Sequence, residues 1–199
     1  MRRFILVLGV VALAAVFVLS ACSGAKKAAE GALKTAEQAV NGTKAEAEKI
    51  IPEQVKTLEA ALNSVKEKFT KGDYKGALAD AQAIPGKAKE VLEAAKAKKE
   101  ELTKTWTSLS EGLPKIIDAI KSRVDILSKS KKLPANITTE KFTEAKSMFT
   151  EAMKDWGVSQ ESFKGGSLAE AVTKANSVKE KAVQILKTLG MPVPEAAKS

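Results

Sequence analysis

The sequence predicts an all-α fold, namely an elongated antiparallel helical bundle of four to five helices built from two related helical hairpins. Along most of the chain, apolar side chains recur at steps of three and four residues, which is the period of an amphipathic helix. No stretch alternates between apolar and polar residues over a useful length, so no strand is predicted. Breaks rich in glycine and proline separate the periodic stretches, and together these features place a bundle domain at residues 43–190.

Residues 1–21 have the layout of a secretory signal. The basic start Arg2-Arg3 is followed by an apolar run from Phe4 to Val18 and then by Leu19-Ser20-Ala21-Cys22. These last four residues resemble the lipobox of bacterial lipoprotein precursors, in which the cysteine is the acceptor of the lipid. The resemblance implies cleavage between Ala21 and Cys22, a diacylglycerol on the Cys22 thiol and usually an acyl group on the new amine.

The expected location follows from the same resemblance. Two or three acyl chains on Cys22 hold a protein on a membrane almost permanently, since each buried methylene contributes about 0.8 kcal/mol. Ser23 after the cysteine favours the outer membrane, facing the periplasm, where two membranes are present; otherwise the anchor lies in the outer face of the cytoplasmic membrane. A plain signal peptide with a chance cysteine and an uncleaved membrane helix are the alternatives, although the apolar run is short for a span of about 20 residues.

Residues 22–42 are predicted to form the lipidated N-terminus and a helical tether. Alanines recur there at helical spacing, but the apolar face is thin. Asn41-Gly42 is predicted to end this helix, and Thr43 with Glu46 is typical of a capping box at the start of the next one.

The first hairpin is expected at about residues 45–110. Ile51-Pro52 interrupts or restarts a helix, and the turn Lys71-Gly72-Asp73 ends it. A second helix is expected from Tyr74 to near Leu109, with Pro85 kinking it more than breaking it.

Three further elements follow before the chain ends. Leu113-Pro114 is predicted to open a separate third helix, which a polar stretch at residues 128–136 terminates. Thr138 or Thr139 is expected to cap a fourth helix. Gly165-Gly166, a capping box from Ser167 to Glu170 and Gly190 are expected to bound the last helix, and residues 191–199 to form a flexible C-terminal tail.

An internal repeat relates the first hairpin to a second one, which is expected at about residues 138–190. Residues 69–92 align without a gap with residues 163–186, 94 positions later. Phe69 then matches Phe163 and Gly72 matches Gly166, so the glycine turn and the apolar phase coincide.

Composition argues against an enzyme. The chain has no histidine and one cysteine, which the lipid would consume, so the usual zinc ligands and the cysteine and serine nucleophile arrangements are missing. No pair of carboxylates has a spacing that suggests a metal or an acid/base pair, and no cofactor is expected. The net charge of +9 comes from lysines interleaved with glutamates, which is typical of solvated helix faces. Nucleic-acid binding is not expected, because a basic helix with interleaved aromatics is absent.

Five residues are candidates for an interaction or ligand surface. They are two adjacent apolar side chains of the third helix, one tryptophan and two neighbouring lysines: Trp106, Ile116, Ile117, Lys131 and Lys132. The sequence favours a non-enzymatic envelope lipoprotein that serves as a helical scaffold or interaction module for an envelope protein or the cell wall. The alternative is a periplasmic carrier of a hydrophobic ligand such as a lipid, held within the bundle.

Overall fold

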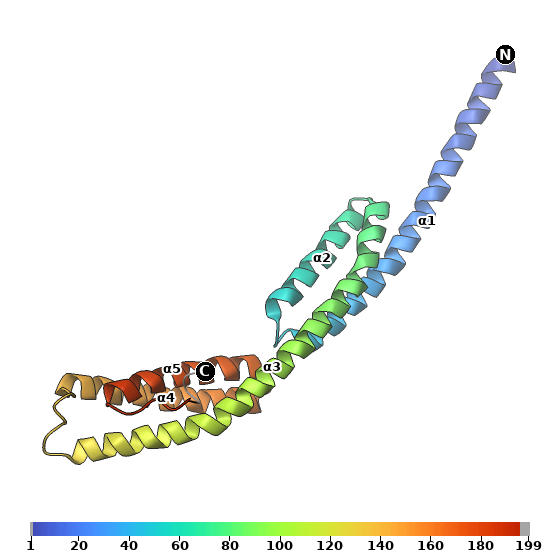
Figure 1. Ribbon diagram of the computed structural model, residues 1–199. Helices are drawn as coiled ribbons and strands as arrows, with labels where there is room; N and C mark the ends of the chain where they lie inside the picture. The colour runs from blue at the N-terminus through green and yellow to red at the C-terminus, as the bar shows by residue number, and fades with distance from the viewer. Residues whose placement is uncertain (1, 196–199) are drawn as a thin grey trace. The chain divides into compact units, whose positions relative to one another are not determined.

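The computed structural model describes the backbone of residues 2–195 and the side chains of residues 24–195. The described chain is all helical: α1 (Arg2–Ala47), α2 (Pro52–Thr70), α3 (Tyr74–Lys129), α4 (Thr139–Lys164) and α5 (Leu168–Thr188) (Figure 1). These residues contain no strand, as the sequence predicts. Within residues 24–195, no helix is long and apolar enough to cross a membrane.

The chain divides into two compact units, Met1–Lys96 and Ala97–Ser199. In the first unit, α1, α2 and the first part of α3 share one core. That core is rich in alanine, which permits close approach of helices. Its buried members are Ala29, Ala36, Val40, Leu58, Leu62, Val65, Ala77, Ala81, Ile84 and Ala88.

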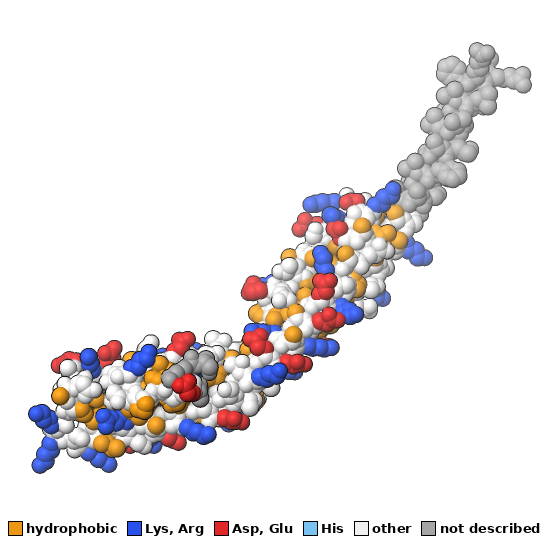
Figure 2. Space-filling view, in the orientation of Figure 1, with side chains coloured by type: hydrophobic (Ala, Val, Ile, Leu, Met, Phe, Trp, Pro, Cys, Tyr) orange, Lys and Arg blue, Asp and Glu red, His pale blue; other side chains and the backbone are white. Residues whose placement is uncertain are grey.

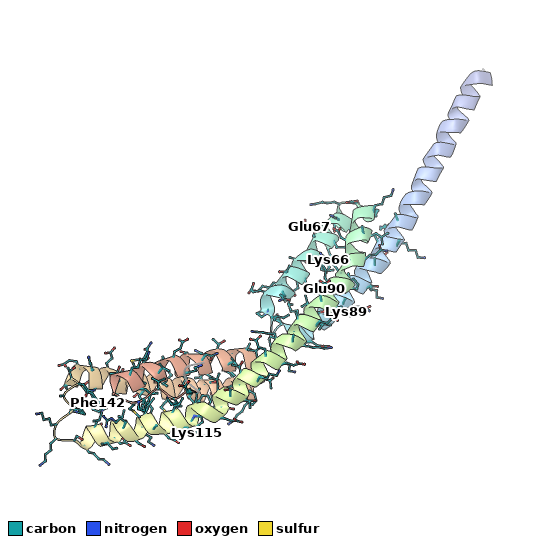
Figure 3. The ribbon with its side chains drawn as sticks, in the orientation of Figure 1. Lys66, Glu67, Lys89, Glu90, Lys115 and Phe142 are labelled. Carbon is teal, nitrogen blue, oxygen red and sulfur yellow. The ribbon has the colours of Figure 1, made fainter. Side chains whose placement is uncertain are left out.

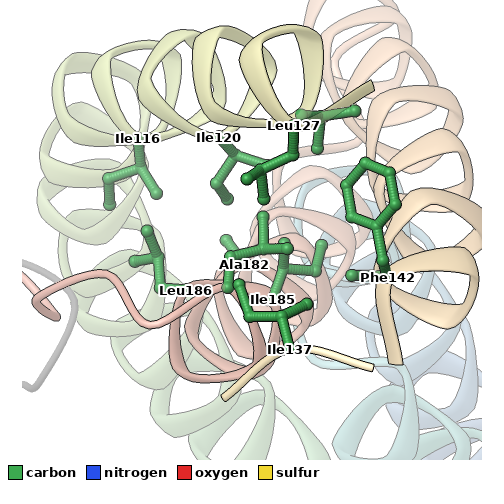
Figure 4. Packing of buried hydrophobic residues seen from close by; sticks show 11 residues of the cluster. Ile116, Ile120, Leu127, Ile137, Phe142, Ala182, Ile185 and Leu186 are labelled. Atoms are coloured by element: carbon green, nitrogen blue, oxygen red, sulfur yellow. The ribbon is translucent and has the colours of Figure 1, made fainter. Parts of the chain in front are cut away.

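The second unit joins the last part of α3 to the hairpin of α4 and α5. Its core contains larger side chains than that of the first unit, and Figure 4 shows part of it at close range. The buried members of this cluster are Ile116, Ile120, Val124, Leu127, Ile137, Phe142, Ala145, Ala182, Ile185, Leu186 and Leu189.

The two predicted hairpins are present, and their turns are built identically. Gly72 and Gly166 both have positive φ, at 82° and 76°. In the first turn the amide of Gly72 donates to the carbonyl of Phe69, and the amide of Asp73 donates to that of Lys68. The equivalent residues of the second turn, 94 positions later, make the same two hydrogen bonds. This is the Schellman motif, in which glycine accepts the left-handed backbone that ends a helix.

The predicted helix end at Asn41-Gly42 is wrong, because α1 continues to Ala47. Thr43 is not a cap: it is 1% exposed, and its hydroxyl donates to the carbonyl of Ala39 at 2.9 Å. One exposed glycine costs a helix only about 1 kcal/mol. Burial of Val40 and Ala47 on either side of Gly42 offsets this cost.

The predicted break at Leu113-Pro114 is also wrong, because α3 is one helix of 56 residues. A proline in a helix interior removes one backbone hydrogen bond and costs about 3 kcal/mol. The apolar face remains in phase across the proline, with Leu109, Leu113 and Ile117 all buried. Pro85 lies inside the same helix and does not end it, as predicted.

Other predicted boundaries are confirmed in part. Pro52 begins α2 after a short break, and the Thr138 side chain accepts a hydrogen bond from the amide of Lys141 at the start of α4. Ser167 precedes α5, but its side chain makes no capping hydrogen bond there, so the second predicted capping box is wrong. The structure shows the backbone of Met191 bonded to the Leu186 carbonyl at 2.8 Å, which turns the chain back after α5.

Candidate functional site

The predicted anchor residues Ala21 and Cys22 lie outside the residues whose side chains the structure describes. The described side chains of α1 begin just after them, at Ala25, and that of Ala29 is the first that is fully buried. The helix that follows the predicted anchor therefore belongs to the core of the first unit.

Trp106 lies in an aromatic stack in the second unit. Its side chain is 8% exposed, and its ring stacks on Phe163 at 4.5 Å and on Trp156 at 5.9 Å between centroids. Phe163 is 43% exposed, so it presents the outer face of the stack to solvent. Trp106 thus contributes to packing, and the accessible aromatic surface belongs to Phe163, which sequence reasoning did not select.

Ile116 and Ile117 are both buried, at 6% and 5% exposure. Ile116 belongs to the main cluster of the second unit, where it points toward Leu186 (Figure 4). Adjacent helical residues point about 100° apart, so the two isoleucines contact different neighbours. Lys131 and Lys132 are exposed in the connection between α3 and α4 and are separate from this apolar region.

An apolar groove of about 470 Å³ lies where α3, the end of α5 and the following segment meet in the second unit. Ile116 and Leu186 form its buried floor, and Met191, Pro192 and Pro194 line one side. Its remaining lining residues come from α3 and include one acidic and one basic side chain: Ser108, Glu111, Gly112, Lys115 and Ala119. Lys115 is labelled in Figure 3. The volume is within the range of small-molecule pockets, about 300–1,000 Å³.

A partly buried ion pair bridges α4 and α5 on another face. The Lys181 ammonium is 2.7 Å from Asp155 and 3.4 Å from Glu151. The hydrogen bond between Lys181 and Asp155 raises the pKa of the lysine and lowers the pKa of Asp155 from their usual values. Both groups stay charged at neutral pH, so this pair fixes the helices to each other and does not exchange protons.

One arginine caps α5 from a distance. Arg123 of α3 donates from Nη2 to the carbonyl of Leu189 at 3.5 Å, where a cation is favourable at a helix C-terminus. Its Nε is buried and makes no hydrogen bond within the described chain. The contact ties the end of α5 to α3.

Elsewhere the described surface mixes charges of both signs (Figure 2). Within residues 24–195 no three acidic, histidine or cysteine side chains gather closely enough to hold a metal ion. Comparison of the chain with protein family models, with curated proteins and with solved structures gives no match. The geometry therefore offers two kinds of feature, an apolar groove and exposed helix faces.

Proposed function

We propose that this protein is a non-enzymatic lipoprotein of the bacterial cell envelope that acts as a helical scaffold or protein-interaction module. The observation that carries the proposal is the sequence Leu19-Ser20-Ala21-Cys22 after a basic and apolar leader. Acyl chains on Cys22 would hold the protein on the outer membrane, facing the periplasm, or on the outer face of the cytoplasmic membrane where there is only one membrane.

The packing of α1 gives this anchor a mechanical consequence. Ala29 lies seven residues after Cys22, and a helix rises about 1.5 Å per residue. The first buried contact of the bundle is therefore about 10 Å along the helix from the lipidated residue. Such a short helical connection would hold the first unit close to the membrane surface, whereas a long flexible linker would let it move away.

The sequence has no histidine, and within residues 24–195 no acidic or cysteine side chains gather closely enough to hold a metal ion. Both observations favour a binding role over catalysis. Exposed helix faces with mixed charge can supply the polar rim of an interface with a protein or cell-wall partner.

The anchor is tested by fractionating cells of the native host that express the full chain. The wild-type chain is expected in the detergent-soluble membrane fraction, with a mass that includes acyl chains on Cys22. Cys22→Ala is expected to lose both the acyl mass and the cleavage. Ser23→Ala serves as the matched control, because it changes the neighbouring residue and keeps the thiol. A Cys22→Ala chain that retained the acyl mass would refute the anchor.

The groove of the second unit favours a second candidate function, which is carriage of a hydrophobic ligand. Its floor of Ile116 and Leu186 suits an acyl chain, and Lys115 at the rim suits an anionic head group. Native mass spectrometry of the full chain from its host tests for a retained ligand. Ala119→Trp would fill the groove and abolish binding of a fluorescent long-chain fatty acid, whereas Ala97→Trp, outside the groove lining, would not. Equal binding by both variants would refute a site in this groove.

A further inference from the structure

A second groove lies between α2 and α3 of the first unit and has a volume of about 350 Å³. Its apolar floor is made by Leu58, Ala61 and Val91, and two opposite charges of α3 stand beside it, Lys87 and Glu90. Both charged residues are exposed, and Figure 3 labels Glu90 on the stretch of α3 that runs beside α2.

Comparison with the second copy of the internal repeat shows that the groove between α2 and α3 lacks an ion pair at this position. In the second unit the equivalent of Lys87 is Lys181, which is bridged across the helices to Asp155 and Glu151. At the positions equivalent to Asp155 and Glu151, the first unit has Ala61 and Thr57.

Without these carboxylates, Lys87 makes no ion pair within residues 24–195. Neither does Glu90, whose equivalent in the second unit is the uncharged Gln184. In the first unit α2 and α3 are bridged elsewhere, by Lys68 and Asp80 at 2.6 Å. At the position equivalent to the Lys181 bridge, that unit instead has two unpaired charges beside an apolar groove.

Lys87 of one copy of the chain and Glu90 of a second copy have opposite charges and can pair with each other. They are three residues apart on one helix, so a two-fold axis between them would bring each Lys87 opposite the Glu90 of the other copy. Ala83 and Ala94 lie four residues outside the charges on either side, and their small side chains permit close approach of two helices. An isologous contact of this kind satisfies both charges of both copies at once.

We propose that the α2–α3 face of the first unit is a self-association surface, on which Lys87 of each copy pairs with Glu90 of the other above the apolar groove. The inference rests on the interaction role proposed above and names a second copy of the chain as the partner.

The test uses reciprocal charge reversal in the full chain. Two differently tagged copies are expressed together in the native host and extracted in mild detergent, and recovery of the second tag with the first is measured. When both copies carry Lys87→Glu, or both carry Glu90→Lys, like charges meet at both contacts between positions 87 and 90 of the two copies. Recovery of the second tag should then fall about tenfold or more. When one copy carries Lys87→Glu and the other carries Glu90→Lys, every rim contact again joins opposite charges, and recovery should return to the wild-type level.

Lys96→Glu is the matched control. It makes the same charge change on α3, but nine residues after Lys87 its side chain points about 180° away, and it should leave recovery unchanged. If wild-type copies are not recovered together, the inference is overturned, while the anchor of the proposed function stands or falls by its own fractionation test. If the single variants lose recovery but the mixed pair does not regain it, a second copy is overturned as the partner.

A further variant tests the argument from the repeat. Ala61→Asp supplies the carboxylate that Asp155 provides in the second unit, so Lys87 would pair within its own chain and recovery should fall. Ala60→Asp adds the same charge one residue earlier, about 100° around α2, and should have little effect. Equal recovery with both variants would overturn the role assigned to Lys87.

Discussion

Replacing glycine by alanine is predicted to change stability with opposite signs at different positions of this chain. Gly72 and Gly166 occupy the two equivalent turns with φ of 82° and 76°. A Cβ in this left-handed region costs about 1–2 kcal/mol. No atom lies within 4 Å of a Cβ built at either glycine, so no new contact offsets that strain. Gly72→Ala and Gly166→Ala should each lower the free energy of unfolding by about 1 kcal/mol.

Gly86 provides the matched control. It is exposed in the interior of α3, and a Cβ built there also meets nothing within 4 Å. Alanine at an interior helical position is favoured over glycine by about 0.5–1 kcal/mol. Gly86→Ala should therefore raise the free energy of unfolding by about that amount.

The assay is urea unfolding of the full chain in mild detergent, followed by far-ultraviolet circular dichroism. A slope of about 1–3 kcal/mol per molar urea converts a change of 1 kcal/mol into a midpoint shift of about 0.5 M. The two turn variants should shift the midpoint of their own unit downward by similar amounts. A turn variant that shifted its midpoint upward, as Gly86→Ala should, would refute the left-handed turn at that position.

Three more predictions concern the stability of the second unit. Trp106→Ala should lower the free energy of unfolding by about 3–5 kcal/mol, because it removes a buried ring and the stack on Phe163. Phe163→Ala should lower it less, because that ring is partly exposed. Equal losses in urea unfolding would contradict this difference in burial. Asp155→Asn should cost about 1 kcal/mol at neutral pH. Its partner Lys181 lowers the folded-state pKa of Asp155, so this contribution is complete above the unfolded pKa and disappears as the pH falls through the folded pKa. The difference between the unfolding curves of the two chains should therefore be greatest at pH 7 and should shrink as the pH is lowered below the unfolded pKa of Asp155. Thr138→Ala should lower the free energy of unfolding by about 1 kcal/mol, because it removes the N-cap of α4. Thermal unfolding measures this loss. The same loss from Thr139→Ala would contradict the assignment of Thr138 as the cap.

Features that depend on a few neighbouring residues could be predicted from the sequence. The turn after α2, the start of α2 at Pro52 and the cap at Thr138 all follow from side chains that act on their own backbone. The equivalence of Gly72 and Gly166 was also visible as a repeat, because a left-handed turn requires the same residue type wherever it occurs.

The continuity of α1 through Gly42 and of α3 through Pro114 was not visible in this way. A glycine or proline weakens a helix locally by about 1–3 kcal/mol, and whether the helix continues depends on what its flanking residues bury. Those contacts come from other helices, so the local signals predicted two breaks that do not occur.

The candidate surfaces depended still more on tertiary structure. The sequence selected Trp106 and Ile116, but only the fold brings Phe163 over Trp106 and Leu186 opposite Ile116. The sequence by itself determined an all-helical chain, its repeated turn and the motif that predicts a lipid anchor. The tertiary structure alone decided which side chains remain at the surface and which charges remain unpaired, because burial and ion pairing depend on residues that are distant in the chain.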